Sequence, residues 1–323
     1  MSVNSKFLKI MYRLTLPGGL LLVISVALIR VGFLANQDGP AVRYAPLAIF
    51  AIALGLCGFF RRSRLFFATL AITLATAVLG WVAPYVGADA AHILRNAIAL
   101  LLPINLLVLA FVRERGIISP VGRKRLAWIA GEIIAVAFLC LPKINVLAAP
   151  LDREFLPPIF SDWSRISQPA LASFLISAIV LTVLLVQRYR AVESSLLWAL
   201  ISSFVAFRIG ATNNLAGIFF ATGGLAIIVA LIETSYSMAY LDELTQLPSR
   251  RALNEAMMKL PETFTVAMLD VDHFKKFNDS FGHESGDQAL RMVASKLAHI
   301  AGGGKAYRYG GEEFAVLFPG KPS

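Results

Sequence analysis

Three acidic residues near the end of the chain could together bind a divalent cation: Asp270, Glu312 and Glu313. Asp270 lies in a short apolar run, 264–271, of the kind that forms a buried strand, and it is followed by polar residues. The two glutamates follow Gly310-Gly311 within an alternating segment, 307–318, that is typical of a β-hairpin. Mg²⁺ is usually held by one or two carboxylates together with substrate phosphates, so these acids indicate phosphoryl-transfer chemistry.

The neighbouring residues suit a nucleotide. Lys275, just beyond the predicted strand, supplies positive charge for phosphates. Asn278 and Asp287 offer an amide and a carboxylate, which can read the donors and acceptors of a base edge. Gly310 and Gly311 carry no Cβ, so the turn can adopt unusual backbone angles and a bulky ligand can approach the main chain.

Helical patterns surround these strands. Apolar residues recur at helical spacing from Leu253 to Leu260, after Pro248, which stands where a helix would begin. A second helical pattern covers about 287–300. The predicted strand, helices and hairpin together form an α+β core.

Composition divides the chain near Ile232. Of the 323 residues, 57% are apolar and 15% charged, against about 25% charged in soluble proteins. The formal charge is +12 up to Ile232 and −2 after it. Because the basic excess lies in the apolar part, it indicates membrane orientation and excludes a nucleic-acid partner, which would need a basic face on a soluble domain.

The apolar part predicts a polytopic α-helical membrane bundle. Each of its long apolar runs is near the roughly 20 residues that a helix needs to cross a bilayer. We count eight runs, at 14–35, 44–60, 65–86, 95–112, 126–147, 169–187, 195–209 and 212–232.

Basic residues concentrate in alternate flanks of these runs, which is typical of cytoplasmic loops. Thirteen lie there: Lys6, Lys9, Arg13, Arg61, Arg62, Arg64, Arg113, Arg115, Arg123, Lys124, Arg125, Arg188 and Arg190. The pattern predicts cytoplasmic N- and C-termini for a multi-pass protein of a bacterial inner membrane, with membrane lipid as a partner. An even number of spans gives the same orientation.

Placing Glu132 in a bilayer costs free energy, because this carboxylate lies inside the fifth predicted span. A carboxylate there could pair with a basic residue, carry a proton or contact a ligand. A salt bridge between helices, or a side chain reaching toward the interface, is the plainer interpretation.

The order of three motifs identifies a family. The segments LDELTQLPSRRAL (241–253), LDVDHFKKFNDSFGHESGDQAL (269–290) and YRYGGEEF (307–314) resemble the GGDEF family of diguanylate cyclases. The resemblance covers about 241–323 and implies a nucleotidyl-cyclase-like domain that condenses two GTP molecules into cyclic di-GMP and releases pyrophosphate.

The resemblance also implies the roles of individual residues. Asp270, the Val271 carbonyl and Glu313 would bind Mg²⁺, two ions per half-site, with Mn²⁺ as an alternative. Glu312 would assist deprotonation of the ribose 3′-hydroxyl or bind metal. Asn278 and Asp287 would hold guanine. The phosphates would contact Lys275 and the main chain of His273 and Phe274. Gly311 would leave room for the nucleotide at the turn. Because each domain holds one GTP, the resemblance implies a homodimer through these domains and the membrane region.

Several positions depart from the family pattern. Gln246 replaces a glycine and Ser249 an asparagine in the first motif, while Glu312 replaces an aspartate. Ala301 and Gly304 occupy the positions of the RxxD feedback motif, so that site is expected to be absent. The sequence ends at Ser323, where the family domain continues, so we expect only the N-terminal half of the domain here.

We therefore predict a transmembrane sensory domain at 1–232, a connecting signalling helix at 233–244 and the partial GGDEF domain at 245–323. The function would be a membrane-bound diguanylate cyclase that its sensory region controls. The alternatives are a GTP-binding receptor module without turnover and a transporter-like membrane protein with a regulatory tail.

Overall fold

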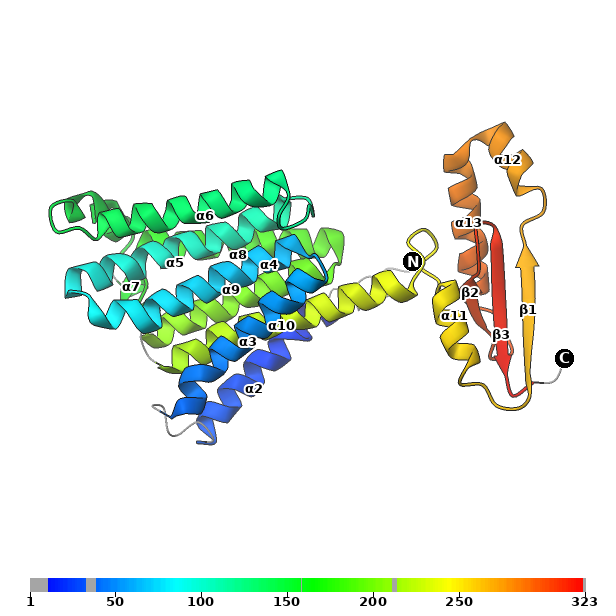
Figure 1. Cartoon of the computed structure of the whole chain (residues 1–323), viewed down its shortest axis with the longest axis horizontal. Helices are drawn as coiled ribbons and strands as arrows, with labels where there is room; N and C mark the ends of the chain where they lie inside the picture. Colours follow the sequence, from blue (N-terminus) through cyan, green and yellow to red (C-terminus); the bar gives the residue numbers. More distant parts are fainter. Residues whose placement is uncertain (1–10, 33–38, 158, 211–213, 322–323) are drawn as a thin grey trace. The chain divides into compact units, whose positions relative to one another are not determined.

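The computed structural model describes residues 11–32, 39–157, 159–210 and 214–321. The chain divides into two compact units, Met1–Ile232 and Glu233–Ser323. Helices make up the first unit, and the second combines helices with a small sheet (Figure 1).

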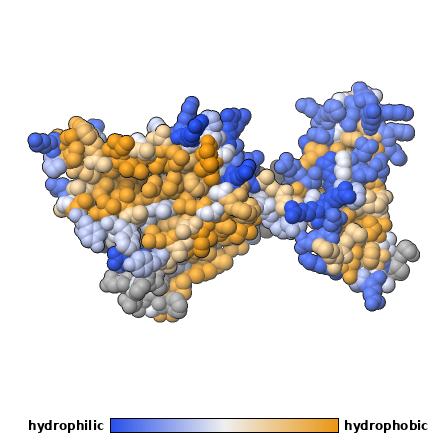
Figure 2. All heavy atoms as spheres, in the orientation of Figure 1, coloured by the Kyte–Doolittle hydropathy of each residue, from blue (hydrophilic) through white to orange (hydrophobic). Residues whose placement is uncertain are grey.

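The first unit is built mainly from long helices. In chain order its elements are α2 (Gly18–Arg30), α3 (Pro40–Phe59), α4 (Ser63–Ala77), η1 (Val78–Val82), η2 (Ala83–Tyr85), α5 (Ala88–Phe111), α6 (Pro120–Leu139), η3 (Asn145–Asp152), α7 (Ile159–Ser164), α8 (Gln168–Arg188), α9 (Ala191–Gly210) and the start of α10 (Asn214–Tyr240). Apolar side chains cover much of the outer surface of this unit in the view of Figure 2. Such a surface suits the hydrocarbon of a bilayer.

Seven described helical segments are long and apolar enough to cross a membrane: Met11–Arg30, Val42–Phe59, Ser63–Tyr85, Ala88–Phe111, Gln168–Arg188, Ala191–Gly210 and Asn214–Tyr240. They coincide with seven of the eight predicted runs.

The predicted run 126–147 does not match a helix of this kind. Helix α6 covers Pro120–Leu139 instead, because Ser119 caps it by accepting a hydrogen bond from the Gly122 amide at 3.1 Å. This earlier start brings Arg123, Lys124 and Arg125 into a helix that also holds Glu132. Helix α6 therefore carries more charged residues than any of the seven segments named above. The fifth span thus stays a prediction.

Two basic residues that were expected in cytoplasmic flanks, the buried Arg64 and the half-buried Arg188, pair with one buried glutamate. Arg64 at the start of α4 and Arg188 at the end of α8 both contact Glu193 Oε1, at 3.3 and 3.2 Å. Arg64 also donates through Nε to the Leu109 carbonyl at 2.8 Å, and its side chain is buried. A buried carboxylate is tolerable only with such partners, so this cluster ties α4, α5, α8 and α9 together.

The second unit has an α+β fold, as predicted. Its elements are the end of α10, α11 (Arg250–Met257), β1 (Phe264–Asp270), α12 (Phe274–Phe281), α13 (His283–Leu297), β2 (Lys305–Arg308) and β3 (Glu313–Pro319). The sheet has the order β1-β3-β2, and both pairs are antiparallel.

Strand β3 lies in the middle of the sheet, and its side chains alternate between two layers of core. Phe314 and Val316 pack with Leu290 and Ala294 of α13. On the other face, Ala315 and Leu317 pack with Leu253 of α11 and with its neighbours. Helices therefore cover both faces of β3, and the ladder to β1 holds the ends of the two strands together.

Three details of the predicted elements are wrong. Strand β1 is an edge of the described sheet and is not buried, since Met268 is 54% exposed. Helix α13 begins at His283 and not near 287, after a separate helix, α12, that the sequence analysis missed. Helix α10 ends at Tyr240, so the predicted connecting helix at 233–244 is not helical to its end.

Candidate active site

The acids that end β1 and begin β3 lie opposite each other. Asp270 is the direct cross-strand partner of Glu313 in the antiparallel ladder, and both side chains are exposed. Residues that face each other in this way have Cβ atoms about 4.5–5.5 Å apart, close enough for two carboxylates to hold one ion. Like charges in this position repel each other, and a divalent cation between them would remove the repulsion.

The third acid does not complete a metal cage. Glu312 is half-buried in the turn before β3. Within the described ranges, no three or more His, Cys, Asp or Glu side chains are grouped so that they could hold a metal ion. The sequence predicts three carboxylates at neighbouring strand ends, and the structure brings two of them opposite each other. Two carboxylates fit Mg²⁺, which keeps several waters and takes further oxygens from substrate phosphates.

The glycines of the turn provide space and not unusual backbone angles. Neither Gly310 nor Gly311 has a positive φ, which corrects the expectation from the sequence. A Cβ at Gly310 would lie 2.7 Å from Glu313 Oε2, so only glycine leaves that carboxylate in place. A Cβ at Gly311 would meet nothing within 4 Å. The main chain at Gly311 is therefore open to a ligand.

An arginine that the sequence analysis did not single out holds the turn. Arg308, at the end of β2, donates through Nη2 to the Gly311 carbonyl at 2.7 Å and through Nε to the Gly310 carbonyl at 3.2 Å. Its Nη1 forms an ion pair with Asp242 Oδ1 at 2.7 Å. One guanidinium thus connects the loop after α10 to the turn, a use that its fixed fork of donors allows.

Asp242 is itself held in its charged form. Burial favours the neutral acid, but hydrogen bonds from the Thr245 hydroxyl, Arg308 and the Thr245 amide outweigh it and lower the pKa of Asp242. The sequence held a local hint of this ion pair, since Asp242 in DELT and Arg308 in YRYGG each lie beside a turn. Pairing across 66 residues cannot be read from local spacing.

The connection from β1 to α12 presents main-chain groups next to Asp270. His273 has a left-handed conformation, with a φ of 55°, and precedes the first turn of α12. The Phe274 amide donates to the Val271 carbonyl at 3.2 Å, so this amide is already engaged, whereas the carbonyl keeps a second lone pair for a cation. Lys275 is exposed on α12.

Asn278 and Asp287 lie on α12 and α13, the two helices that pack against each other. Gly282, with a φ of 81°, makes the turn between them. Asn278 packs so closely on Gly286 that a Cβ there would clash with its Oδ1. That oxygen is buried and has no hydrogen-bond partner in the described part of the chain. An open acceptor of this kind is costly unless a ligand satisfies it.

Comparison with known proteins shows what the segment that holds these residues is similar to. The family model described as "Diguanylate cyclase, GGDEF domain" matches residues 239–323. Probable diguanylate cyclase DgcI of Escherichia coli (strain K12) is 41% identical over 104 residues, which are 30% of this chain and 24% of that protein. Diguanylate cyclase VdcA of Vibrio cholerae serotype O1 is 45% identical over 87 residues, 26% of each chain.

A solved structure, the coiled coil and GGDEF domain of DgcB from Caulobacter crescentus in complex with c-di-GMP, is 39% identical, with a TM-score of 0.26; the match covers 28% of this chain and 52% of that one. The chain spans about a quarter of the length of the two curated relatives named above.

Proposed function

We propose that the GGDEF domain at residues 239–323 makes this protein a diguanylate cyclase, which condenses two GTP molecules into cyclic di-GMP and releases pyrophosphate. The observation that carries the proposal is the pairing of Asp270 with Glu313 beside the glycine turn. Similarity to diguanylate cyclases over the same residues supports it.

Asp270, the Val271 carbonyl and Glu313 would hold Mg²⁺, two ions per half-site, with Mn²⁺ as an alternative. Oxygen donors at two adjacent chain segments fit this ion. When bound, the metal lowers the pKa of the attacking hydroxyl and neutralises charge on the phosphate. Glu312, which is half-buried next to Glu313, would accept the proton of the ribose 3′-hydroxyl or add a metal ligand.

Asn278 and Asp287 would hold the guanine. The unpartnered Asn278 Oδ1 can accept from an N–H of the base, and the exposed Asp287 carboxylate can accept from others. Gly286 supports this arrangement because any larger residue would displace the amide.

The phosphates would lie between the start of α12 and the glycine turn. Lys275 supplies positive charge there, and the main chain at His273 and Phe274 supplies N–H groups. The Phe274 amide would have to share or release its bond to Val271 when phosphate binds. The open space at Gly311 leaves room for the nucleotide.

Two domains must act together, because cyclic di-GMP joins two nucleotides and each site holds one GTP. A two-fold arrangement places the 3′-hydroxyl of one nucleotide against the α-phosphate of the other, and reciprocally. We therefore propose a homodimer that forms through the GGDEF domains and the membrane region.

The helices of the first unit would anchor the protein as a multi-pass protein in a bacterial inner membrane, in contact with lipid, with both termini in the cytoplasm. Seven segments have the length and composition for crossing, and α6 would be the eighth. Helix α10 runs without interruption from Asn214 to Tyr240. This continuous helix would carry sensory control from the first unit to the cyclase. Reporter fusions that are active only on one side of the membrane, placed after Phe111 and after Tyr240, test the orientation.

The cyclase is tested on the full-length gene product in lipid nanodiscs with GTP and Mg²⁺, with cyclic di-GMP measured by mass spectrometry. We expect product from the wild type and from the control Glu262→Gln, an exposed residue before β1, and about a hundredfold less or lower still from Glu313→Gln at ordinary Mg²⁺. GTP binding without product in the wild type would contradict turnover and favour the receptor-module alternative.

A further inference from the structure

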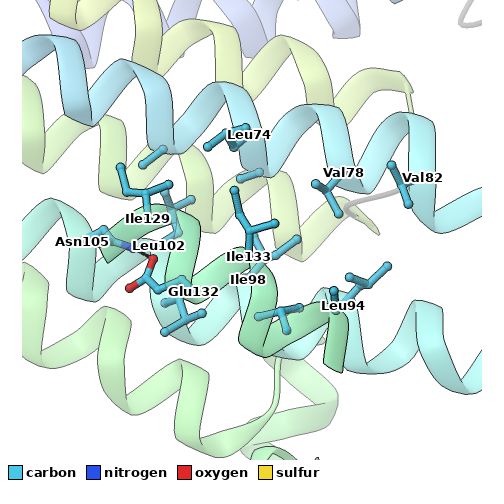
Figure 3. A pocket seen from close by; sticks show the side chains of 15 residues that line it. Leu74, Val78, Val82, Leu94, Ile98, Leu102, Asn105, Ile129, Glu132 and Ile133 are labelled. Atoms are coloured by element: carbon cyan, nitrogen blue, oxygen red, sulfur yellow. Dashed lines mark hydrogen bonds between the residues drawn. The ribbon is translucent and has the colours of Figure 1, made fainter. Parts of the chain in front are cut away.

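The first unit contains a cavity of about 320 Å³ between α4 with η1, α5 and α6. This volume is at the lower end of the range of small-molecule sites. Figure 3 shows the side chains that line it: Leu74, Val78 and Val82 come from the first of these segments, and Ile98 and Leu102 from α5. The wall is therefore almost entirely aliphatic, which suits the apolar body of a ligand.

Two polar side chains, Asn105 of α5 and Glu132 of α6, lie together at one end of the cavity (Figure 3). Asn105 Nδ2 donates to Glu132 Oε2 at 2.8 Å, and Trp128 Nε1 donates to Glu132 Oε1 at 2.8 Å. These bonds fix the carboxylate in one orientation. The prediction of a salt bridge between helices is wrong for this residue, because no described basic side chain pairs with it.

The carboxylate has no cationic partner among the described residues, and it keeps free acceptor positions. Both of its donors are neutral, and a carboxylate has about four lone-pair sites, of which two are used. Arg125 lies two turns earlier on α6, but it donates to Ser63 Oγ and to the Arg113 carbonyl. An isolated negative charge among aliphatic side chains is unfavourable unless a cation joins it.

The backbone is irregular at the other end of the cavity. Val78–Val82 form a π-helix, η1, which continues α4 and contributes two lining side chains. π-helices are rare and occur frequently at functional sites. The irregular turn and the unpaired carboxylate are independent features of one cavity.

We propose that this cavity is a binding site for a lipophilic primary amine. Its ammonium group lies against Glu132, where it supplies the missing positive charge and donates to the free lone pairs. Its apolar chain runs between η1 and α5 toward Val82 and Leu94. Charge complementarity selects a cation over a neutral alcohol or a fatty acid of the same length. The site does not depend on the proposed cyclase.

The experiment uses the full-length protein in nanodiscs of phosphatidylcholine, which carries no net charge. The probe is an alkylamine of ten carbons that carries a photoreactive diazirine in its chain, and cross-linked peptides are mapped by mass spectrometry. Decylamine and 1-decanol serve as competitors. We expect saturable labelling of α4, α5 or α6, with decylamine competing at least about thirtyfold better than the alcohol, as the loss of a desolvated charge pair implies.

The variants test the role of the carboxylate. Glu132→Gln keeps the shape and is expected to weaken amine binding at least about thirtyfold, whereas the matched control Asp89→Asn, an exposed residue of α5, leaves it unchanged. The comparison of amine with alcohol needs no variant, so it decides the matter if Glu132→Gln does not fold. Equal competition by the two compounds, labelling that does not saturate, or undiminished labelling of folded Glu132→Gln would overturn the proposal.

Discussion

Truncation of Arg308 to alanine is expected to loosen the glycine turn. The change removes two hydrogen bonds to the carbonyls of Gly310 and Gly311 and one ion pair with Asp242. In this variant the Asp242 carboxylate keeps its two hydrogen bonds from Thr245, so it is not left without partners. The side chain of Asp242 is 24% exposed and that of Arg308 is 13% exposed. The free energy lost with this ion pair is therefore smaller than for a fully buried pair.

We expect the variant to lose about 2 to 4 kcal/mol of local stability, from the usual value of hydrogen bonds to charged groups. Hydrogen exchange of the full-length protein, followed by mass spectrometry, measures this directly. The relevant amides are those of Arg308, which donates to Pro248, and of Tyr309 and Gly310, which both donate to Glu313. Their exchange should accelerate about 30- to 1000-fold.

Arg291→Ala is the matched control. Arg291 is exposed on α13, so its loss should change exchange in the turn by less than about threefold. Cyclic di-GMP synthesis should fall in Arg308→Ala and not in Arg291→Ala, because the turn carries Glu313. Equal protection of the turn in both variants would refute the idea that Arg308 holds it.

Three further outcomes follow from the site. Glu313→Gln should lower synthesis by about a hundredfold or more at ordinary Mg²⁺, with partial recovery at high Mg²⁺; full activity would contradict a metal role. Gly310→Ala should displace the Glu313 carboxylate and reduce activity, whereas Gly311→Ala should weaken GTP binding, as titration with a non-hydrolysable GTP analogue can show, while both variants stay folded. Asp242→Asn should speed exchange in the turn by a constant factor at neutral pH. Because the folded-state pKa of Asp242 is lowered from 3.8, this difference should persist above pH 3.8 and vanish as the pH falls through the folded-state value; a difference that is unchanged in strong acid would refute the assignment.

The two units differ in how well their elements follow from local patterns. Seven of the apolar runs match long helices, because a run of about 20 apolar residues permits few other structures. Helix α6 was misplaced because a capping serine and a proline set its start, not hydrophobicity. In the second unit the alternation of 307–318 predicted the hairpin correctly, whereas α12 was missed, although Phe274, Phe277 and Phe281 recur at helical spacing, because it spans only 8 residues.

Local patterns were enough to limit the site to carboxylates, an amide and a lysine, because side-chain identity and short spacing are local properties, and the motif segments lie within the match to the GGDEF model at residues 239–323. Three features come from tertiary packing: Asp270 faces Glu313, Arg308 joins Asp242 to the turn, and Glu132 has no basic partner among the described residues. Each depends on strand register or helix packing between residues far apart in the chain, which no local period encodes.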